Sequence, residues 1–550
     1  MLEQPALPRN VSLPGDDAPV APAVSGAVAS PARAAVLVLL VGAALTALLL
    51  FAGLQATDYH FTYPLDDAYI HLALARTLAQ DHLLGINPNS LGAASSSPFW
   101  TLGLAALVKV FGPNEWLPLI LNGLAGVALL LILERLLRGS LPDWRVRSGA
   151  IILIMLLMPL VPLMISGMEH VAHTAAVLLL CWAALRNRPG ALAVFLLSAL
   201  ATGLRFETAF VAFGLSCVLL SRRNWAAAAA GLGGVAAVAL AVGYWQITQG
   251  EGLIANSLLA KSVGHPSWPW LLHKLEVGLR NFSKAPLLLT LAVVAALLGF
   301  LPRRDSEPQA PADRFSAGLS VTFLVAVLLH CFLAAVGWFE RYQAYLVVMG
   351  LVAVAGPLYR LLSAYRPSAE GTALRPAHYH LLLAALVCFG LLIPGYRALG
   401  QYFTCHRASR NIYDQQYQLA RFIRLYYNDA SLVISDIGYI GLLTDAHILD
   451  AQGLATREVA VAMATGGLTP EIMTALAQSR QAVLAIGYDL NGIPTDRWPL
   501  VCTWEISDNV ICGNPTVGFR VIDPAQRPAL LRHLREFQPK LPSSVVVTYY

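Results

Sequence analysis

Residues 64–71, PLDDAYIH, place two adjacent carboxylates, Asp66 and Asp67, directly after the first long apolar segment of the chain. That segment runs from about 34 to 54, which is longer than the roughly 7 to 15 apolar residues of a signal peptide. It therefore predicts an uncleaved membrane-spanning helix. An acidic pair in this position predicts either a cap for the following helix or a functional group at the membrane surface.

The composition indicates that the first apolar segment is one of many. Of the 550 residues, 57% are hydrophobic and 13% are charged. Soluble globular proteins carry about 25% charged residues, so the chain is predicted to be a polytopic α-helical membrane protein. The net charge of +5 is small and gives no reason to expect nucleic acid as a partner.

About eleven segments before residue 400 are apolar enough to be predicted as spans, although two near residue 200 are short. Residues 98–112 are excluded because this segment is only 15 residues long and contains Lys109. We expect it to form a helix along the membrane surface that begins at Ser97 and Pro98. The predicted spans lie near residues 34–54, 116–137, 148–166, 169–186, 190–203, 206–221, 225–247, 285–301, 315–338, 342–361 and 379–398.

Basic residues segregate to alternate loops, which the positive-inside rule assigns to the cytoplasm. Residues 1–33 are then a disordered cytoplasmic tail, and residues 34–399 form a transmembrane domain whose first external loop is 55–115. Residues 400–550 are predicted to lie outside the cytoplasm. The basic loops are 138–147, 186–188, 222–223, 303–314 and 360–375.

The external part is predicted to be a small α/β domain. Helices are expected at 413–427 and 470–479, and the segments SLVISDIG, QAVLAIGYD, PLVCTWEI and NVICG read as strands. Cys502 and Cys512 bracket a hairpin-like stretch, CTWEISDNVIC. An external location would permit a disulfide between them, which the sequence leaves open.

Ionisable residues at the other helix ends all fall on the external side of this topology. Such groups cost about 2.5–3.5 kcal/mol each at membrane depth and are functional-site candidates. Their gathering on one face predicts a cavity that opens outward. They are Asp66, Asp67, Glu169, His170, Arg205, Glu207, Lys261, His265, Glu340 and Arg341.

Each candidate has a structural alternative. The acidic pair could cap a helix. In the functional alternative, one carboxylate acts as general base and its neighbour lies beside it. Lys261 and His265 could anchor a loop at the interface or neutralise a phosphate. The remaining alternatives are ion pairs for Arg205–Glu207 and Glu340–Arg341, and turn chemistry for Asp436 and Asp450. His170 and His173 are one helical turn apart, but without a third matched ligand they do not predict a metal site.

Six segments, in this order, resemble those of GT-C integral-membrane glycosyltransferases that use polyprenyl-phosphate sugars. The resemblance is greatest to the group that contains cell-wall arabinofuranosyltransferases and related mannosyl- and pilin-glycosyltransferases. Phe206 and Ser257 depart from the pattern, which more often has Pro and Thr there. The segments are DDAYIHLALARTLAQDHLLGINPNSLGAASSSPFW (66–100), ISGMEHVAH (165–173), RFE (205–207), ANSLLAK (255–261), ERY (340–342) and SDIGYIGLLTDAHILDAQGLA (435–455).

The resemblance implies an inverting transferase of the bacterial inner membrane with its site at the external face. It implies that Asp66 is the general base, with Asp67 beside it. Its partners would be the lipid bilayer, a polyprenyl-phosphate donor of a sugar such as arabinofuranose or mannose, and a glycan, lipid or protein acceptor. The donor phosphate would be bound by Lys261, Arg205, Arg341 and His265, and the substrates by Glu169, His170, Glu207, Glu340 and Asp436.

No cofactor is required by this chemistry, and no residue spacing calls for the divalent cation that an acidic pair could bridge to a phosphate. Two other functions remain open. A carrier of lipid-linked glycans would be expected to show repeated halves and polar groups near the membrane midplane, whereas the charges here gather at one face. A glycan ligase or polymerase would share the fold but use a larger donor.

Overall fold

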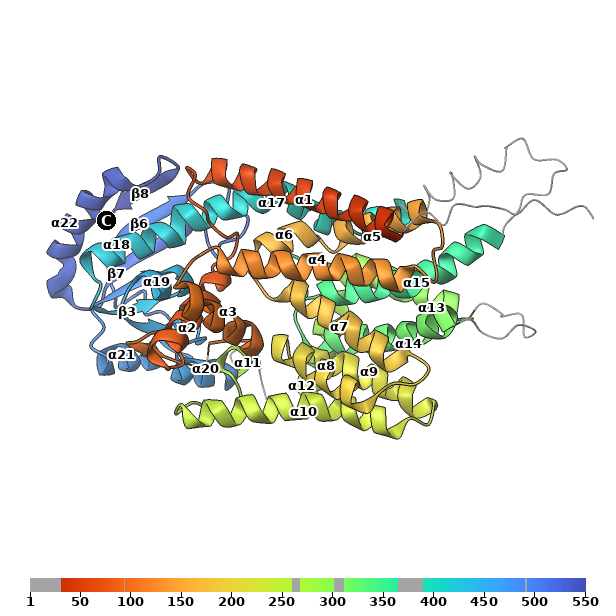
Figure 1. The fold of residues 1–550 in the computed structure, drawn as a ribbon. Helices are drawn as coiled ribbons and strands as arrows, with labels where there is room; N and C mark the ends of the chain where they lie inside the picture. The colour runs from red at the N-terminus through yellow and green to blue at the C-terminus, as the bar shows by residue number, and fades with distance from the viewer. Residues whose placement is uncertain (1–30, 93, 260–267, 301–310, 365–388, 490–491) are drawn as a thin grey trace, which may run out of the picture.

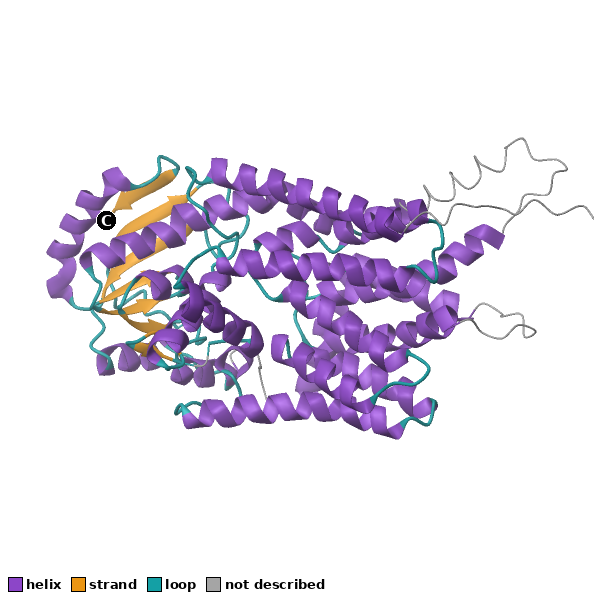
Figure 2. Ribbon diagram, viewed as in Figure 1, coloured by secondary structure: helices purple, strands orange, loops and turns teal. Residues whose placement is uncertain are grey.

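The computed structural model describes residues 31–92, 94–259, 268–300, 311–364, 389–489 and 492–550. The chain is mostly helical, and a six-stranded sheet lies at one end of the molecule (Figures 1 and 2). We call this the sheet end. The predicted tail at 1–33 therefore lies almost wholly outside the described residues.

The helices before residue 390 run mostly lengthwise, away from the sheet end (Figure 1). In chain order they are α1 (Pro31–Ala56), α2 (Asp67–Asp81), α3 (Pro98–Phe111), α4 (Leu117–Leu137), α5 (Trp144–Leu157), α6 (Leu160–Ile165), α7 (His170–Leu185), α8 (Ala191–Leu204), α9 (Thr208–Ser221), α10 (Trp225–Thr248), α11 (Asn256–Leu259), α12 (Trp268–Lys284), α13 (Pro286–Phe300), α14 (Pro311–Leu333) and α15 (Ala344–Ala364). Two short strands, β1 (Gly85–Asn87) and β2 (Ser90–Leu91), pair between α2 and α3.

Within the described residues, the helices α1, α4, α10, α14 and α15 are long and apolar enough to cross a membrane. These are five, or six if α12 and α13, which meet at a bend of 93°, form one span. The predicted count of eleven spans is not confirmed, because α7, α8 and α9 are helical but short, the segment 148–166 is divided into α5 and α6, and residues 379–388 lie outside the described part. The predicted helix at 98–112 is confirmed as α3, whose first residue is Pro98.

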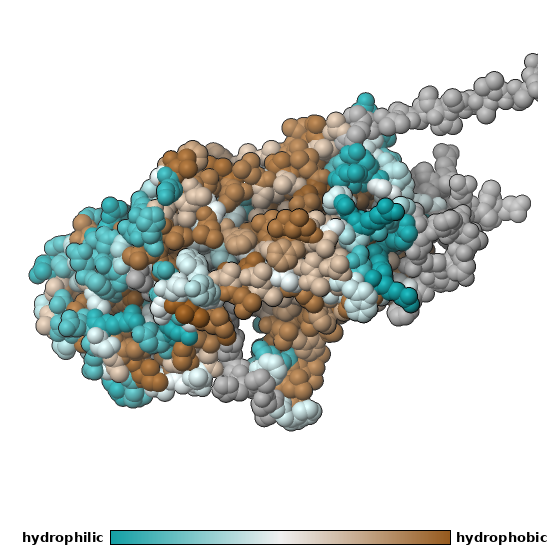
Figure 3. Space-filling model, turned by 60° about the horizontal axis from the view of Figure 1, so that its bottom comes forward, coloured by the Kyte–Doolittle hydropathy of each residue, from teal (hydrophilic) through white to brown (hydrophobic). Residues whose placement is uncertain are grey.

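Hydrophobic side chains form a band across the middle of the molecule, with hydrophilic side chains at both ends (Figure 3). The described parts of the basic loops gather at the end away from the sheet. Arg222 donates hydrogen bonds to the carbonyl oxygens of Leu185 and Arg314, and Arg360 pairs with Asp313. The sequence pattern of alternate basic loops thus corresponds to one face of the folded chain.

The C-terminal part begins with one long helix that contains a π-helical turn. It consists of α17 (Tyr396–Ile412), the π-turn Tyr413–Tyr417 and α18 (Gln418–Tyr426). The predicted amphipathic helix at 413–427 is therefore helical, but it continues α17 instead of starting anew. A π-turn inside an α-helix is frequently found at a functional site.

The sheet has the strand order β4-β3-β5-β7-β6-β8. Strands β4, β3 and β5 are parallel, and the remaining pairs are antiparallel. Its strands are β3 (Ser431–Ile434), β4 (His447–Asp450), β5 (Leu484–Gly487), β6 (Leu500–Ile506), β7 (Thr516–Val521) and β8 (Val545–Tyr549), and its helices are α19 (Gly438–Leu443), α20 (Arg457–Ala464), α21 (Pro470–Ser479) and α22 (Arg527–Phe537). Residues 432–434 of β3 are buried and apolar, which is typical of a parallel strand that is covered on both faces.

Three of the four predicted strands are present, as β3, β5 and β6. The prediction of a strand at NVICG, residues 509–513, is wrong: β6 pairs instead with β7, which begins at Thr516. The segment between them is a loop fixed by Asn509, whose side-chain oxygen accepts hydrogen bonds from the backbone N–H groups of Ile511 and Cys512. Cys502 and Cys512 are both free thiols in this arrangement.

Candidate active site

The two acids of the opening motif have different partners, and neither partner lies nearby in the sequence. Asp66 precedes α2, but its side chain does not cap that helix. Its carboxylate oxygens instead accept hydrogen bonds from the backbone N–H groups of Gly438 and Tyr439, at 2.7 and 3.0 Å. These residues begin α19, so Asp66 fixes α2 to the sheet. The prediction of a side-chain cap by Asp66 is therefore wrong for α2, whereas Asp67 does lie in the first turn of the helix.

Gly438 allows this contact because it has no side chain. A Cβ atom added at this position would lie 2.2 Å from the carbonyl oxygen of Asp66 and 2.6 Å from its Oδ2. The rings of Tyr69 in α2 and Tyr439 in α19 stack beside the contact, with centroids 3.6 Å apart. Both rings are fully buried. Close backbone approach and aromatic stacking together make this junction rigid.

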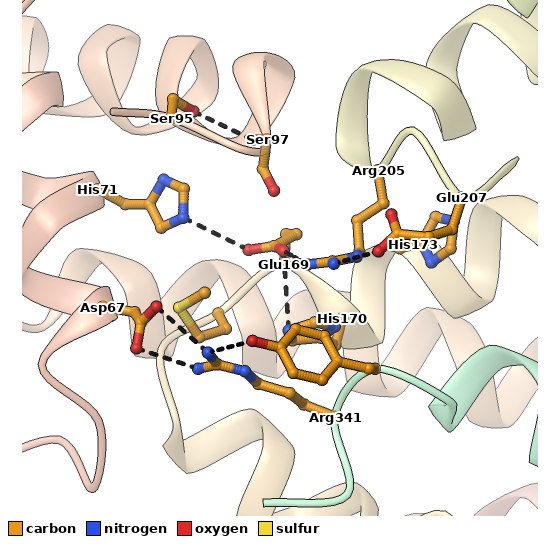
Figure 4. Close-up of polar contacts among 12 residues, drawn as sticks. Asp67, His71, Ser95, Ser97, Glu169, His170, His173, Arg205, Glu207 and Arg341 are labelled. Atoms are coloured by element: carbon orange, nitrogen blue, oxygen red, sulfur yellow. Dashed lines mark hydrogen bonds and ion pairs between the residues drawn. The ribbon is translucent and has the colours of Figure 1, made fainter. Parts of the chain in front are cut away.

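Asp67 forms a two-pronged ion pair with Arg341, whose guanidinium nitrogens lie 3.2 and 3.3 Å from the two carboxylate oxygens (Figure 4). Arg341 is buried, whereas the Asp67 side chain is 39% exposed. The guanidinium also lies over the ring of Tyr342. This planar arrangement holds Asp67 in a fixed orientation while leaving it open to the cavity described below.

Asp436 reaches the same region from the sheet. It follows β3, and Gln452 and Tyr488 follow the parallel strands β4 and β5. Its carboxylate accepts hydrogen bonds from the Tyr488 hydroxyl, from the Gln416 amide in the π-turn at 2.8 Å, and from the Gln452 amide at 3.2 Å. Ligand sites commonly form at the carboxyl ends of parallel strands, where such side chains converge.

These groups line one cavity of about 360 Å³ between the helical part and the sheet. We call it the carboxylate cavity. Three of its acids come from two segments far apart in the chain: Asp66 and Asp67 are adjacent, and Asp436 lies about 370 residues further along. Its wall also includes His71, Arg341, Gln416, Gln452 and Tyr488.

The electrostatics of the cavity favour the protonated form of its deepest acid. Burial and the nearby charge of Asp436 raise the pKa of Asp66 to about 8, against the opposing effect of the two backbone N–H groups. Burial likewise raises the pKa of Asp436, although its side-chain donors oppose the change. Because the two carboxyl groups interact, they release their protons in two steps that belong to the pair and not to either residue alone. A carboxylate with a pKa near neutrality is suited to accepting a proton during a reaction.

A second polar network lies beside the cavity, at the ends of α7, α8 and α9 (Figure 4). Arg205 donates to Glu169 at 2.6 Å and to Glu207. The Nε2 atom of His71 lies 3.7 Å from Glu169. The contact with Glu207 confirms the ion-pair alternative for Arg205 and Glu207. Arg205 and Glu169 are both buried, and Arg205 has two carboxylate partners in all.

Several predicted site residues lie elsewhere. Glu340 pairs with Arg397 at 3.0 Å in a separate small cavity, so the structure does not bring it to the acidic pair. His170 is buried next to Glu169 and does not line the carboxylate cavity. Lys261 and His265 lie outside the described residues.

Asp450 has the structural role that turn chemistry predicts. Its carboxylate accepts hydrogen bonds from the backbone N–H groups of Gln452 and Ala455, both at 2.8 Å. This turn positions the Gln452 side chain for Asp436. Among the described residues, no group of three or more His, Cys, Asp or Glu side chains is arranged to hold a metal ion.

The sequence analysis did not identify Gln416, Gln452 or Tyr488. Two of them immediately follow short strands, and the third lies in the predicted helix at 413–427. Recognising β3, β4 and β5 as parallel neighbours would have pointed to Gln452 and Tyr488, because the carboxyl ends of parallel strands share one edge. Gln416 gave no local signal, since only the packing of the π-turn against β3 gives it a role.

A family model described as "Domain of unknown function (DUF8728)" matches residues 410–522, which include Gln416, Asp436 and Tyr488. Comparison with curated proteins gives no match. Among solved structures, the chain is similar to crystal structures of ArnT from Cupriavidus metallidurans, one bound to undecaprenyl phosphate and one in the apo state. Both are 12% identical with a TM-score of 0.46, covering 88% and 87% of this chain and 97% of the ArnT chain.

At 12% identity and a TM-score of 0.46, the chemistry of this chain has to be argued from its own residues.

Proposed function

We propose that the protein is an inverting glycosyltransferase that moves a sugar from a polyprenyl-phosphate donor to an acceptor hydroxyl group. The observation that carries the proposal is the carboxylate cavity, where Asp66, Asp67 and Asp436 meet between apolar helices and a sheet. The raised pKa of Asp66, about 8, is matched to the task of removing a proton from an alcohol. The ion pair with Arg341 orients Asp67 beside it.

In the proposed reaction, the acceptor hydroxyl group lies in the carboxylate cavity and gives its proton to Asp66. Its oxygen forms a new bond to the anomeric carbon of the donor sugar. The bond between that carbon and the phosphate oxygen breaks on the opposite face, and the electron pair leaves with the lipid phosphate. The sugar is therefore transferred with inversion, and no redox partner is needed.

Several features support a lipid-linked donor and a site on the outer face of a bacterial inner membrane. The helices form a hydrophobic band between two hydrophilic ends (Figure 3). The described basic residues lie at the end opposite the sheet, which by the positive-inside rule supports a location of the sheet and the cavity outside the cytoplasm. The N-terminus would then be cytoplasmic. We propose no cofactor.

The test uses the full-length protein in proteoliposomes. The donor is a radiolabelled polyprenyl-phosphate monosaccharide whose sugar is either arabinofuranose or mannose. We expect a new glycosidic bond with inverted configuration, and loss of about 100- to 10,000-fold in transfer rate for Asp66→Asn. The matched control is Asp489→Asn, since Asp489 lines the same cavity but pairs with Arg520. Near-normal transfer by Asp66→Asn would refute the assigned base.

Other outcomes would favour the alternatives. Movement of the labelled lipid across the bilayer without a new glycosidic bond would indicate a carrier. Use of an oligosaccharide-linked lipid, with no use of the monosaccharide donor, would indicate a ligase or polymerase.

A further inference from the structure

We propose that a second cavity, adjoining the carboxylate cavity, binds the phosphate group of the lipid donor on the basic face of α12. This inference rests on the proposed transferase function. It assigns the charge of the phosphate to cations of α12, which the sequence motifs do not contain, although Arg205 also lines this cavity. We call this second cavity the α12 cavity.

The α12 cavity has a volume of about 530 Å³ and two unlike walls. Four basic side chains of α12 form one wall, and the aromatic rings of Phe206, Phe210 and Phe332 form part of the other. The cavity shares Ser96, Ser257 and Tyr342 with the carboxylate cavity, so the two are neighbours. The residues of the basic wall are His273, Lys274, Arg280 and Lys284.

The one acid of α12, Glu276, does not line the α12 cavity. Among the described residues, Lys274, Arg280 and Lys284 form no ion pair with a carboxylate. The acid in the cavity wall, Glu207, already pairs with Arg205. An excess of cations that faces a cavity attracts an anion. Arg205, in contrast, is neutralised by two carboxylates and has less to offer a phosphate.

Ser257 gives a second, independent indication of a ligand. Its side chain is 4% exposed, it lines both cavities, and its hydroxyl group has no hydrogen-bond partner among the described residues. Buried hydroxyl groups are nearly always paired. A phosphate oxygen at the junction of the two cavities would accept a hydrogen bond from this hydroxyl.

The opposite face of α12 indicates that the anion belongs to a lipid. Leu271, Leu272, Leu275 and Leu279 are about half exposed or more and lie on the side away from the basic wall. An exposed leucine face opposite a basic face is typical of a helix at a membrane interface. The bend of 93° between α12 and α13 is consistent with α12 lying across the direction of α13. A phosphate with an apolar chain fits a cavity with one basic and one aromatic wall.

This placement also gives separate binding sites to the acceptor proton and to the departing phosphate. The carboxylate cavity receives the acceptor proton, and the α12 cavity receives the phosphate as the bond to the anomeric carbon breaks. Cations placed where negative charge develops stabilise the transition state. The sugar would then occupy the junction formed by Ser96, Ser257 and Tyr342.

The experiment measures binding of polyprenyl monophosphate to the full-length protein in phosphatidylcholine nanodiscs. We expect the double substitution Lys274→Gln/Arg280→Gln to weaken binding by about tenfold or more for each cation removed. Lys274→Arg should retain affinity because it keeps the charge. The control Arg407→Gln removes an exposed cation of α17 that lies outside the cavity, and it should bind normally. Thermal unfolding of each variant reports folding.

Three ligand arms identify the source of the phosphate. The substitutions should leave binding of polyprenol, which has no phosphate, unchanged, and inorganic phosphate should compete only weakly. Unaltered affinity of the folded double variant for polyprenyl monophosphate would overturn the proposal. So would equal competition by phosphatidylglycerol, which would mark a general anionic-lipid site.

Binding and transfer can fail separately. If the wild-type protein binds polyprenyl monophosphate through α12 but transfers no sugar, the subsite stands and the transferase function falls. If the protein transfers sugar but the α12 variants bind the lipid normally, the function stands and the subsite is wrong.

Discussion

Replacing Asp436 by Asn should shift the pH dependence of the reaction towards lower pH. Asp66 can act as a base only in its ionised form, and its pKa of about 8 means that the ionised fraction grows as the pH rises through 8. The negative charge of Asp436 is the second cause of that raised pKa, after burial. Asn has the same shape and can still accept a hydrogen bond from Tyr488, but it carries no charge.

The size of the effect follows from the surroundings of Asp66. A neighbouring like charge typically raises the pKa of a carboxyl group by about 1 to 3. Removing it should lower the pKa of Asp66 from about 8 to about 7 or below. The ionised fraction at pH 7 would rise from about one tenth to about one half or more, so transfer at pH 7 should rise about fivefold relative to the high-pH plateau. Asp67 stays in place, and its smaller contribution to the raised pKa of Asp66 is unchanged.

The assay is the pH profile of kcat/KM for sugar transfer in proteoliposomes, measured from pH 5 to pH 9. The control is Asp489→Asn, which removes a charge from the same cavity wall without being a cause of the Asp66 pKa. Its profile should match that of the wild type. A midpoint that stays near 8 in Asp436→Asn, or moves upward, would refute the electrostatic coupling of the two acids.

Two further substitutions test the supports of the site. Gly438→Ala should abolish transfer because the added Cβ would lie 2.2 Å from the Asp66 carbonyl oxygen. The control Gly400→Ala should be active, because nothing lies within 4 Å of its added Cβ. Equal rates of the two variants in the transfer assay would contradict this. Glu169→Gln should destabilise the protein by about 1.5–3 kcal/mol, because buried Arg205 loses a charged hydrogen bond. Thermal unfolding in detergent measures this loss, and an unchanged midpoint would count against a structural role for the pair.

The opening motif shows how far local sequence reasoning reaches. The pattern DDAYIHLALARTLAQD correctly predicts a helix that begins at the acidic pair, since α2 starts at Asp67. The local rule for acids at a helix start predicts capping. The Asp66 carboxylate instead accepts a hydrogen bond from the backbone N–H group of Gly438 in α19, 372 residues further along. No periodicity in the sequence reports a hydrogen bond to a backbone N–H group, because every residue other than proline has one.

The ionisable residues give the same lesson. Their position at helix ends of one face was visible from the alternation of basic loops, because charge determines which loops can stay on which side of a membrane. Whether an arginine there is available for a phosphate was not visible. Arg205 is occupied by Glu169 and Glu207, while the cations of α12 face a cavity without a carboxylate partner among the described residues. Only packing decides which charges are neutralised.

The sequence by itself determined that the chain is mostly helical and apolar, that a strand-containing part follows residue 400, and that the acids gather at one face. These properties depend on composition and on short-range periodicity, which act along the chain. The tertiary structure alone decided that Asp66, Asp67 and Asp436 share one cavity, and that Gln416 and Tyr488 join them. Those neighbours come from remote segments, and their meeting depends on the docking of α2 against α19 and on the order of the parallel strands.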